Sequence, residues 1–475
     1  MLKGHEISEV LLSDLEFSGR LDSEYYKPSF LKYEELVKSK KNLSLKNLSN
    51  FLIGPFGSAF TVDNYVQEAN YRYIRGKDVK PLKIRDNDNV YMPKEDYERL
   101  SKYSLKENDI LVSVVGTIGN AALVTKKDLP AIFSCKSTVL RPNKINSVYL
   151  LTYINTKYGK DLLLRKERGA IQKGLNLGDL ETLDVFLPSN SFQLVIENIF
   201  RTSIEKTAQS KQTYTQAENL LLKEIGLQDF TPSKEPVNIK SFKDSFATSG
   251  RLDAEYYQPF YEEVENIIKR NGFTLLQDIC SDINYGTVPT SPYTKTDDGI
   301  PYIKGMNLKN TEIKKDKLDR LVNTEQLPDK YFTKKGDIII SQMGTVGDVG
   351  VIRNEENWLF ASFTIRARLS NFKLFNPSFV GLYIQKVAKK YYLYRNIAQA
   401  SVRQNTDLPT IRGLYLPNID IEKQNVVAEL IEQSFSLKKQ SEHLLEVAKK
   451  AVEIAIEENE EVAIAYINNQ SNSNG

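Results

Sequence analysis

An internal repeat constrains this 475-residue chain more than any other feature. Residues 18–28 read SGRLDSEYYKP and residues 249–259 read SGRLDAEYYQP, so nine of eleven positions are identical at an offset of 231 residues. Further matches follow in the same order, such as DILVSVVGTIG at 109–119 with DIIISQMGTVG at 337–347. A repeat of this length is too long for a solenoid unit and predicts two copies of one domain.

Each copy is expected to hold a strand-rich domain that leads into a long helix. Residues 110–115 and 338–340 are β-branched runs, and the paired glycines after them predict a tight hairpin. Residues 191–225 and 421–456 lack Pro and Gly and carry apolar residues at helical spacing. Each could form a helix of about 50 Å. We therefore expect an α+β fold of two pseudo-symmetric modules, each a mixed α/β domain followed by a helix, with the helices packed as an antiparallel coiled-coil spacer.

The repeat and the composition of the connecting segments give the domain boundaries. The predicted order is a first domain over 1–188, a central long helix over 189–226 and a linker with lead-in over 227–248. A second domain over 249–417, a distal helix over 418–466 and a disordered tail over 467–475 follow. No apolar run approaches the ~18–20 residues of a membrane helix. The first fifteen residues carry three acidic residues and no signal-peptide core, so we expect a cytoplasmic protein.

Scarce histidine and cysteine exclude several kinds of site. The chain has only Cys135, Cys280, His5 and His443, which are scattered singly. This excludes a disulfide framework and disfavours structural zinc and histidine-dependent catalysis. The glycines at 54–57 and 116–119 lack the Gly-Lys-Ser/Thr of a phosphate loop. The NPSF at 376–379 and the EIK at 312–314 imitate methyltransferase and nuclease motifs, but their counterparts in the other copy do not. We therefore predict no catalytic residue and no metal site.

Charge is concentrated at the same place in both copies. Residues 357–406 contain eight Lys and Arg and no acidic residue, a net charge of +8, and residues 129–178 contain nine basic and two acidic residues, a net charge of +7. Since the whole chain carries +3, the remainder carries 3 − 15 = −12. Both windows also contain tyrosines, some of which we expect in the core. Basic residues mixed with aromatics and amides are typical of a nucleic-acid surface.

Two groups of candidate DNA-binding residues follow from these windows. Arg and Lys neutralise phosphates, whereas Asn, Gln and Arg also read base edges. The phosphate candidates are Lys136, Arg165, Lys166, Arg168, Lys173, Arg366, Lys386, Lys389, Lys390 and Arg395. The base-readout candidates are Gln172, Asn176, Arg403, Gln404 and Asn405. The alternative for Gln404 and Asn405 is that they only cap the turn before Leu408-Pro409.

The arrangement resembles the specificity (S) subunit of type I restriction–modification enzymes. The duplicated GRLD-x-EYY segment, the strand–GT[IV]G unit, the amides before Leu-Pro and the long helix after each unit carry the resemblance. It implies two target recognition domains, each reading one half of a bipartite asymmetric double-stranded DNA sequence, and helices that set the spacing and dock two methyltransferase (M) subunits. Restriction/translocase (R) subunits would join. No cofactor is expected on this chain, because S-adenosylmethionine, ATP and Mg would be bound by the partner subunits.

One departure and three alternatives stay open. The polar helix middles, 205–213 and 436–442, weaken the coiled-coil prediction locally, and partners are expected to dock there. A stand-alone DNA-binding regulator of the same fold, or a non-catalytic interaction scaffold, would also fit the sequence. A self-contained methyltransferase fits least well, since no segment is long enough for its domain.

Overall fold

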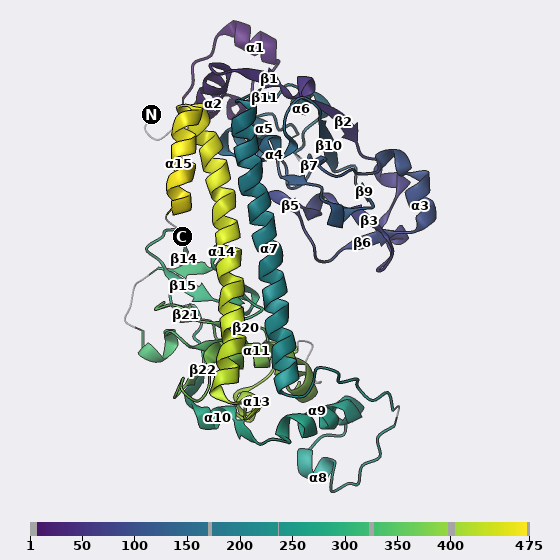
Figure 1. Ribbon diagram of the computed structural model, residues 1–475, viewed down its shortest axis with the longest axis vertical. Helices are drawn as coiled ribbons and strands as arrows, with labels where there is room; N and C mark the ends of the chain where they lie inside the picture. Colours follow the sequence, from purple (N-terminus) through teal and green to yellow (C-terminus); the bar gives the residue numbers. More distant parts are fainter. Residues whose placement is uncertain (1–6, 170–172, 236, 323–326, 398–403, 473–475) are drawn as a thin grey trace. The chain divides into compact units, whose positions relative to one another are not determined.

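The chain divides into two compact units in its computed structural model, which describes residues 7–169, 173–235, 237–322, 327–397 and 404–472 (Figure 1). Unit 1 comprises residues 1–207 and 439–475, and unit 2 comprises residues 208–438. The long helices α7 (Asn190–Glu224) and α14 (Ile421–Glu457) each contribute residues to both units. The two helices predicted over 191–225 and 421–456 are confirmed.

Unit 1 is built on a six-stranded sheet in the order β2-β10-β7-β8-β5-β4, beside a three-stranded sheet β6-β3-β9 and the pair β1-β11. β10 is antiparallel to β2 and β7, whereas β5 is parallel to β8. The strands are β1 (Asn42–Ser44), β2 (Ser49–Ile53), β3 (Tyr71–Ile74), β4 (Val79–Lys80), β5 (Leu82–Ile84), β6 (Val90–Met92), β7 (Ile110–Ser113), β8 (Ala121–Leu123), β9 (Ala131–Phe133), β10 (Ser137–Pro142) and β11 (Asp184–Phe186). The helices are α1 (Leu12–Ser18), α2 (Pro28–Lys38), α3 (Lys94–Arg99), α4 (Ser147–Ile154), α5 (Lys157–Arg165) and α6 (Leu177–Glu181).

Unit 2 repeats this topology. Its four-stranded sheet has the order β13-β22-β19-β20, a second sheet has the order β14-β18-β15-β21, and β12-β23 and β16-β17 form pairs. The strands are β12 (Phe273–Leu275), β13 (Cys280–Tyr285), β14 (Tyr293–Thr294), β15 (Ile300–Ile303), β16 (Leu308–Lys309), β17 (Glu312–Ile313), β18 (Asp319–Leu321), β19 (Ile338–Ser341), β20 (Val349–Val351), β21 (Leu359–Phe360), β22 (Thr364–Leu369) and β23 (Tyr415–Pro417). The helices are α8 (Phe246–Ser249), α9 (Pro259–Lys269), α10 (Leu276–Ile279), α11 (Pro377–Tyr383), the π-helix η12 (Ile384–Leu393), α12 (Tyr394–Asn396) and α13 (Leu408–Arg412).

The shared strand order confirms the two mixed α/β modules that the repeat predicts. β7 and β19 are the β-branched runs, and each pairs antiparallel with the strand after its glycine turn. The proline that closes each GRLD-x-EYY segment is the first residue of α2 or α9, where its fixed φ suits a helix start and its missing N–H is not needed.

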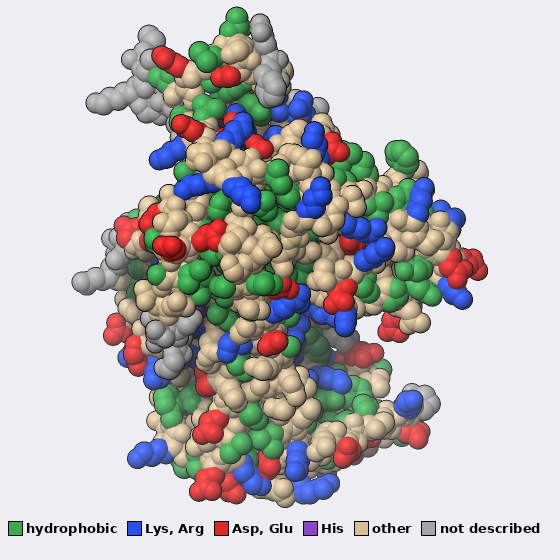
Figure 2. Space-filling model, turned by 45° about the horizontal axis from the view of Figure 1, so that its top comes forward, with side chains coloured by type: hydrophobic (Ala, Val, Ile, Leu, Met, Phe, Trp, Pro, Cys, Tyr) green, Lys and Arg blue, Asp and Glu red, His purple; other side chains and the backbone are tan. Residues whose placement is uncertain are grey.

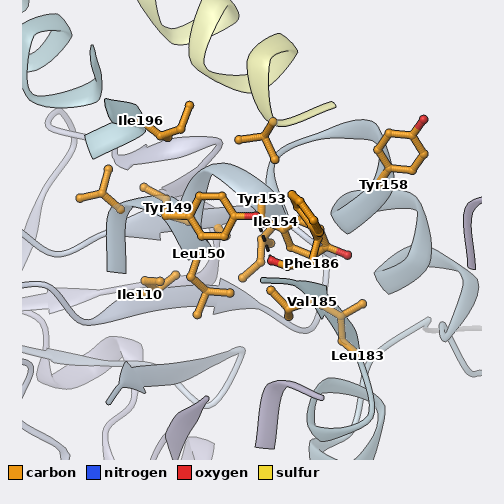
Figure 3. Packing of buried hydrophobic residues seen from close by; sticks show 14 of the residues in the cluster. Ile110, Tyr149, Leu150, Tyr153, Ile154, Tyr158, Leu183, Val185, Phe186 and Ile196 are labelled. Carbon is orange, nitrogen blue, oxygen red and sulfur yellow. Dashed lines mark hydrogen bonds between the residues drawn. The ribbon is translucent and has the colours of Figure 1, made fainter. Parts of the chain in front are cut away.

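Four tyrosines of the basic windows, Tyr149, Tyr153, Tyr158 and Tyr383, lie in the core, as expected for some of them, whereas Tyr394 is exposed. Tyr149 and Tyr153 on α4 are fully buried, and the Tyr149 hydroxyl donates to the Phe186 carbonyl at 2.9 Å (Figure 3). The Tyr153 hydroxyl donates to the Asp184 carbonyl at 2.7 Å. In unit 2 the buried Tyr383 donates in the same way to the carbonyl of Tyr415 at 2.8 Å. Burial raises the pKa of Tyr149 well above its ordinary value, so this hydroxyl keeps its proton. These tyrosines satisfy strand carbonyls that the core would otherwise leave without a donor.

α7 and α14 pack on each other through a seam with coiled-coil spacing. The buried or half-buried seam positions of α7 recur at alternating steps of four and three residues, as a heptad requires. They are 196, 200, 203, 207, 210, 214, 217 and 221. Adding the repeat offset of 231 gives the seam of α14, which begins at Val427 and Ile431. The polar middles therefore do not interrupt the pattern.

Serines fill the centre of this seam. Ser210 and Ser434 donate to each other's carbonyl, both at 2.8 Å, and Ser441 donates to the carbonyl of Ser203 at 2.7 Å. All four serines are buried, and the pairs run in opposite directions along the two helices, which are therefore antiparallel within each unit. Within the polar middles, Ser210 and Ser441 thus bond across the seam, whereas docking of partners at the exposed residues there stays a prediction.

The C-terminal region differs from the predicted distal helix and tail. α14 ends at Glu457, and a separate helix, α15 (Glu460–Asn472), begins after Asn459, whose side chain accepts from the N–H of Val462 at 3.0 Å. Helical structure thus extends into the stretch predicted to be disordered over 467–475, of which 473–475 lie outside the described residues. Ala463 and Ile467 are buried in the core of unit 1, so packing stabilises a helix that the Asn-rich sequence alone does not favour.

Candidate nucleic-acid interface

Several strands of unit 1 end at one edge, where their loops touch. Gly54 follows β2 and lies so close to the next loop that an added Cβ would be 2.6 Å from the Ser134 carbonyl oxygen. The N–H of Gly76, after β3, donates to Ser134 Oγ at 3.2 Å, and the N–H of Val114, after β7, donates to the Lys136 carbonyl at 2.9 Å. We call this surface the loop edge of unit 1, consisting of residues 54–57, 76–77, 114–119, 134–136 and 173–175.

Unit 2 has the same edge. A Cβ added to Gly286, after β13, would lie only 2.1 Å from the Phe360 carbonyl oxygen. Thr287 donates its N–H to the same carbonyl at 2.9 Å. The N–H of Gln342, after β19, donates to the Phe363 carbonyl at 3.0 Å, and that of Gly344 donates to the Gln404 carbonyl at 3.2 Å. The loop edge of unit 2 consists of residues 286–288, 304–306, 342–347, 361–363 and 404–406.

The GT[IV]G hairpin is the most similar part of the two edges. Gly116 and Gly344 have φ of +86° and +79° with open space around them, so backbone conformation alone demands glycine there. One residue on, the threonine hydroxyl bonds back to the serine that ends the strand. The distances are 3.2 Å for Ser113–Thr117 and 3.1 Å for Ser341–Thr345. The predicted tight hairpin is confirmed, and its geometry is fixed identically in both copies.

Arg165 and Arg395, predicted to contact phosphate, instead hold the GRLD-x-EYY segments. Arg165 Nε donates to the Tyr25 carbonyl at 2.7 Å and its Nη1 to Glu34 at 2.7 Å, with the guanidinium over the Tyr25 ring. Arg395 makes the equivalent bonds to the Tyr256 carbonyl and to Glu265. This corrects the prediction for both arginines, since their donors bond within the unit and their side chains are only 5% and 12% exposed.

In each unit an arginine of the repeated segment adds further bonds, and we call the combined arrangement the clip. It consists of Arg20, Asp22, Glu34 and Arg165 in unit 1 and of Arg251, Asp253, Glu265 and Arg395 in unit 2. Arg20 forms a fork with Asp22 at 2.5 and 2.6 Å and donates to the Glu167 carbonyl at 3.0 Å. Arg251 does the same with Asp253 and the Ile397 carbonyl. The clip therefore binds the backbone just after α5 in unit 1 and just after α12 in unit 2. The segment that leads to the loop edge begins at this point in each unit.

Arg366 is also a structural residue. It is 0% exposed, lies over the Phe360 ring, donates to the Phe332 carbonyl and pairs with Asp282. Burial lowers the pKa of its guanidinium. A fully buried guanidinium cannot reach a phosphate, which corrects this prediction.

Most of the basic window of unit 2 is neutralised inside the unit. Five of its eight basic residues pair with a carboxylate outside the window: Arg366, Arg368, Lys386, Lys389 and Arg395. Lys386 bonds Glu218 at 3.0 Å and Lys389 bonds Asp348 at 2.5 Å, whereas Lys390 is exposed beside the Tyr391 ring. On the face drawn in Figure 2, basic and acidic side chains are interspersed. The positive charge of the acid-free window is thus largely neutralised by carboxylates from other parts of unit 2.

The remaining phosphate candidates are in unit 1. Lys136 is exposed at the loop edge, and Lys173, also exposed there, is 3.2 Å from Glu24. Arg168 is exposed and donates to Asp179 at 3.1 Å. Lys166 is half-buried beside Thr182 at 3.0 Å, and burial lowers its pKa. Lys136, Arg168 and Lys173 are therefore the predicted cations that the structure brings to or beside the edge.

The base-readout candidates divide into three groups. Gln172 and Arg403 lie outside the described residues. Asn176 caps α6, accepting from the N–H of Asp179 at 2.9 Å, so its amide has a structural role. Gln404 is exposed and Asn405 is half-buried at the loop edge of unit 2. The backbone of Asn405 forms an isolated antiparallel β-bridge with Met343. The cap of α13 is Asp407, whose carboxylate accepts from Thr410, so Gln404 and Asn405 are not the capping residues.

Exposed apolar residues at the loop edges were missed by the sequence analysis. Phe56 in unit 1 and Val288, Met306 and Phe363 in unit 2 are exposed. The glycines at 54–57 had been considered only as a phosphate loop. The useful signal was that Phe56 and Val288 each stand two residues after the glycine that follows an equivalent strand.

The described part of the chain offers neither a metal site nor a membrane span. There, no group of three or more His, Cys, Asp and Glu side chains is placed to hold a metal ion, and none of the helices combines the length and hydropathy of a membrane span. A groove of about 240 Å³ in unit 1 is lined by Ile199, His443 and Leu444 among others, but it lies away from the loop edge.

Comparison with known proteins finds relatives for a large part of the chain. Residues 57–219 match the family model of the type I restriction modification DNA specificity domain. The EcoBI specificity subunit of Escherichia coli, a type I restriction enzyme, is 24% identical over 199 residues, covering 42% of this chain and 40% of that protein. The match thus spans less than half of that relative.

A type I S subunit from M. genitalium is 14% identical, with 86% of this chain and 94% of that one covered and a TM-score of 0.45. The HsdS subunit from Thermoanaerobacter tengcongensis is 12% identical, with 88% and 97% covered and a TM-score of 0.29. The resemblance seen in the sequence is confirmed over residues 57–219, which match the family model of this domain.

Proposed function

Because residues 57–219 form a type I restriction modification DNA specificity domain, we propose that the whole chain is the DNA-recognition subunit of such an enzyme. Each unit reads one half of a bipartite asymmetric duplex target through its loop edge. The observation that carries the proposal is the recurrence of one loop edge in both units on identical hairpins but with different exposed side chains. Two edges with different chemistry suit two different half-sites.

The chain acts without catalysis of its own. Methyl transfer, ATP-driven translocation and cleavage belong to M and R subunits, which bring S-adenosylmethionine, ATP and Mg. Purified chain alone is expected neither to methylate nor to cut DNA. Methyl transfer from labelled S-adenosylmethionine by the chain, at a rate that follows its concentration through purification, would contradict this.

Selection from a duplex pool with randomised positions tests the recognition proposal. We expect enrichment of two short half-sites at a fixed distance. Gln404→Ala should weaken binding by about 1–3 kcal/mol if it loses a bidentate base contact, and should relax only one half-site. A single contiguous motif, or no enrichment by the full-length chain either alone or with M subunits, would contradict the proposal.

Salt dependence tests the cationic part of the loop edge. Lys77, which is exposed and pairs with the exposed Asp88 at 3.2 Å, and the exposed Lys136 lie at the edge of unit 1. Replacing both with Ala should make the log–log salt dependence of binding shallower by about 1.8, at roughly 0.9 per lost phosphate contact. The control is Lys423→Ala, because Lys423 is exposed on α14 and pairs with Glu224 at 2.7 Å. An equal slope for the double variant and the control would remove these lysines from the interface.

Two copies of one partner are expected to dock on the GRLD segments. Arg20, Asp22 and Tyr26 bond within unit 1, but Leu21 between them is 85% exposed, and its counterpart Leu252 is 77% exposed. An apolar side chain that both copies keep, yet neither buries, favours an external contact. Leu21→Asp or Leu252→Asp should each remove one M subunit in native mass spectrometry. Unchanged stoichiometry in the double variant would exclude this surface.

The helices are proposed to set the half-site spacing. Seven residues added to both α7 and α14 keep the heptad phase of the seam and lengthen each helix by about 10 Å. Since DNA rises about 3.4 Å per base pair, the preferred gap should grow by about three base pairs. An unchanged gap in a folded variant would show that the helices are not the ruler.

A further inference from the structure

The loop edges carry exposed apolar side chains at the same place in both units. Phe56 is 86% exposed and Val288 is 62% exposed, and each stands two residues after the glycine that follows β2 or β13. Gly54 and Gly286 are pressed against the carbonyl oxygens of Ser134 and Phe360, with no room for a Cβ. The tight approach fixes the path of each loop. One exposed apolar residue on a surface would need no explanation, but exposed apolar residues at the same position of both units do.

The second unit adds two apolar residues where the first has lysines. Met306 and Lys77 each follow the glycine after an equivalent strand, β15 or β3. Phe363 and Lys136 each stand directly before an equivalent strand, β22 or β10. All four are exposed. At these three equivalent positions unit 1 therefore has one apolar and two cationic residues, whereas unit 2 has three apolar residues.

We propose that these apolar residues determine sequence by contacting the 5-methyl group of thymine in the half-site that their unit reads. The inference rests on the proposed function. On the major-groove edge of B-DNA the apolar group is the thymine methyl, and apolar side chains contact it. Insertion between bases would require a ring or a long side chain, yet Val288 occupies the position of Phe56. Methyl contact is the chemistry that Phe and Val share.

The two half-sites should differ in composition for the same reason. Lysine donates to guanine O6 and N7 or to phosphate, whereas an apolar side chain gains nothing from guanine. The half-site of unit 2, with Val288, Met306 and Phe363, is expected to depend on thymine at more positions than the half-site of unit 1.

Uracil substitution tests the methyl contact directly. Deoxyuridine keeps every hydrogen-bonding group of thymidine and removes only the methyl. In the selected target, replacing the contacted thymine should weaken binding of the full-length chain about fourfold, the equilibrium equivalent of one buried methyl group. Phe363→Ala should weaken binding to the thymine duplex and lose the uracil effect at the one thymine that Phe363 contacts, whereas thymines contacted by Val288 and Met306 should keep it. Phe363→Leu should preserve part of the preference.

Matched controls separate this contact from general effects. Leu374→Ala removes an exposed apolar side chain of unit 2 outside the loop edge and should keep the full thymine preference. Phe56→Ala should abolish the preference only in the other half-site. Thermal melting confirms that the variants remain folded, which their exposure leads us to expect.

Three results would overturn the inference. They are no uracil effect at any thymine of either half-site, a set of uracil-sensitive thymines that is unchanged in both Phe56→Ala and Phe363→Ala, and a Phe56-dependent rise in 2-aminopurine fluorescence without uracil sensitivity, which indicates insertion. Loss of the inference alone leaves sequence-specific binding intact. If the wild-type chain selects no sequence at all, both this inference and the proposed function fail.

Discussion

The two units share a strand order but fill the same position of one central strand with opposite chemistry. In unit 1, Val139 of β10 lies buried beside Leu52 and Leu111. In unit 2, the equivalent residue of β22 is the buried Arg366, paired in register with Asn284 and Ile339. The neighbouring ion pairs are conserved, because Arg141–Asp109 and Arg368–Asp337 occupy equivalent positions. The hairpins and the clip are thus common to both units, whereas side chains in the sheet interior and at the loop edge differ between them.

Transferring the buried arginine to unit 1 should have the largest effect. Val139→Arg places a guanidinium opposite Leu52, with no carboxylate facing it from β2 or β7 at that position. The desolvation of an unpaired ion costs several kcal/mol, which is comparable to the stability of a domain, so unit 1 should not fold. Circular dichroism and limited proteolysis of the full chain would measure this. Val139→Ile is the control, and a cooperative, native-like melt for Val139→Arg would contradict the argument.

The reverse change in unit 2 should be less severe. Arg366→Val removes one partner of a buried charge cluster and should cost roughly 3 kcal/mol, at the lower end for such pairs, because Asp337 keeps its bond to Arg368. Urea unfolding would measure the loss. Adding Asp282→Leu, which removes the carboxylate that loses Arg366 as its partner, should recover part of it. Greater destabilisation by the double variant than by the single one would show that Asp282 has another role.

Removing one buried hydroxyl should make unit 1 more like unit 2 at moderate cost. Tyr149 donates to the Phe186 carbonyl, whereas the equivalent Phe379 has no hydroxyl. Tyr149→Phe should destabilise unit 1 by about 1 kcal/mol, the typical net worth of one hydrogen bond. Tyr394→Phe is the control because Tyr394 is exposed. Equal melting curves for wild type and Tyr149→Phe would mean that another donor satisfies this carbonyl.

The smallest expected effect concerns the clip, which the two units share. Hydrogen bonds from Arg20 and Arg251 hold the pKa of Asp22 and Asp253 below the ordinary value. A lowered folded-state pKa stabilises the fold above the unfolded pKa of about 4, and this contribution disappears as pH falls below that value. Both carboxylates are partly exposed, so we expect under about 1 kcal/mol each.

Asp22→Asn and Asp253→Asn measure this contribution in each unit. Each should lower the melting temperature slightly at pH 7, by similar amounts, and the difference from wild type should shrink when the pH falls from 4 toward 2. A difference that stays constant over this range would show that the carboxylate charge is not responsible.

The repeat and the local periodicity predicted the frame well. Helix ends were within a few residues, since a proline- and glycine-free stretch with apolar spacing depends on nearby residues. Identical hairpin motifs likewise predicted identical turns. The termination of α14 near Asn459 was missed because no Gly or Pro marks it.

The charged residues show where sequence reasoning ends. Arg395 and its partner Glu265 are 130 residues apart in the chain, and nothing local to either indicates the pairing. A basic window therefore predicted an external surface where the fold provides internal carboxylates. The exposed Phe56 and Phe363 were missed for the opposite reason, because an apolar residue is expected in the core unless the course of its loop is known.

The serine seam has a consequence for the origin of the chain. Ser203 and Ser434 are equivalent in the repeat, as are Ser210 and Ser441, so the bond between Ser210 and Ser434 and the bond between Ser203 and Ser441 are copies of one contact. Such an interface is isologous, since each helix presents to its partner the surface that it receives. A single ancestral module could have associated with itself through this contact as a homodimer. Gene duplication and fusion would then have preserved the interface without redesign and released the two loop edges from having to be alike.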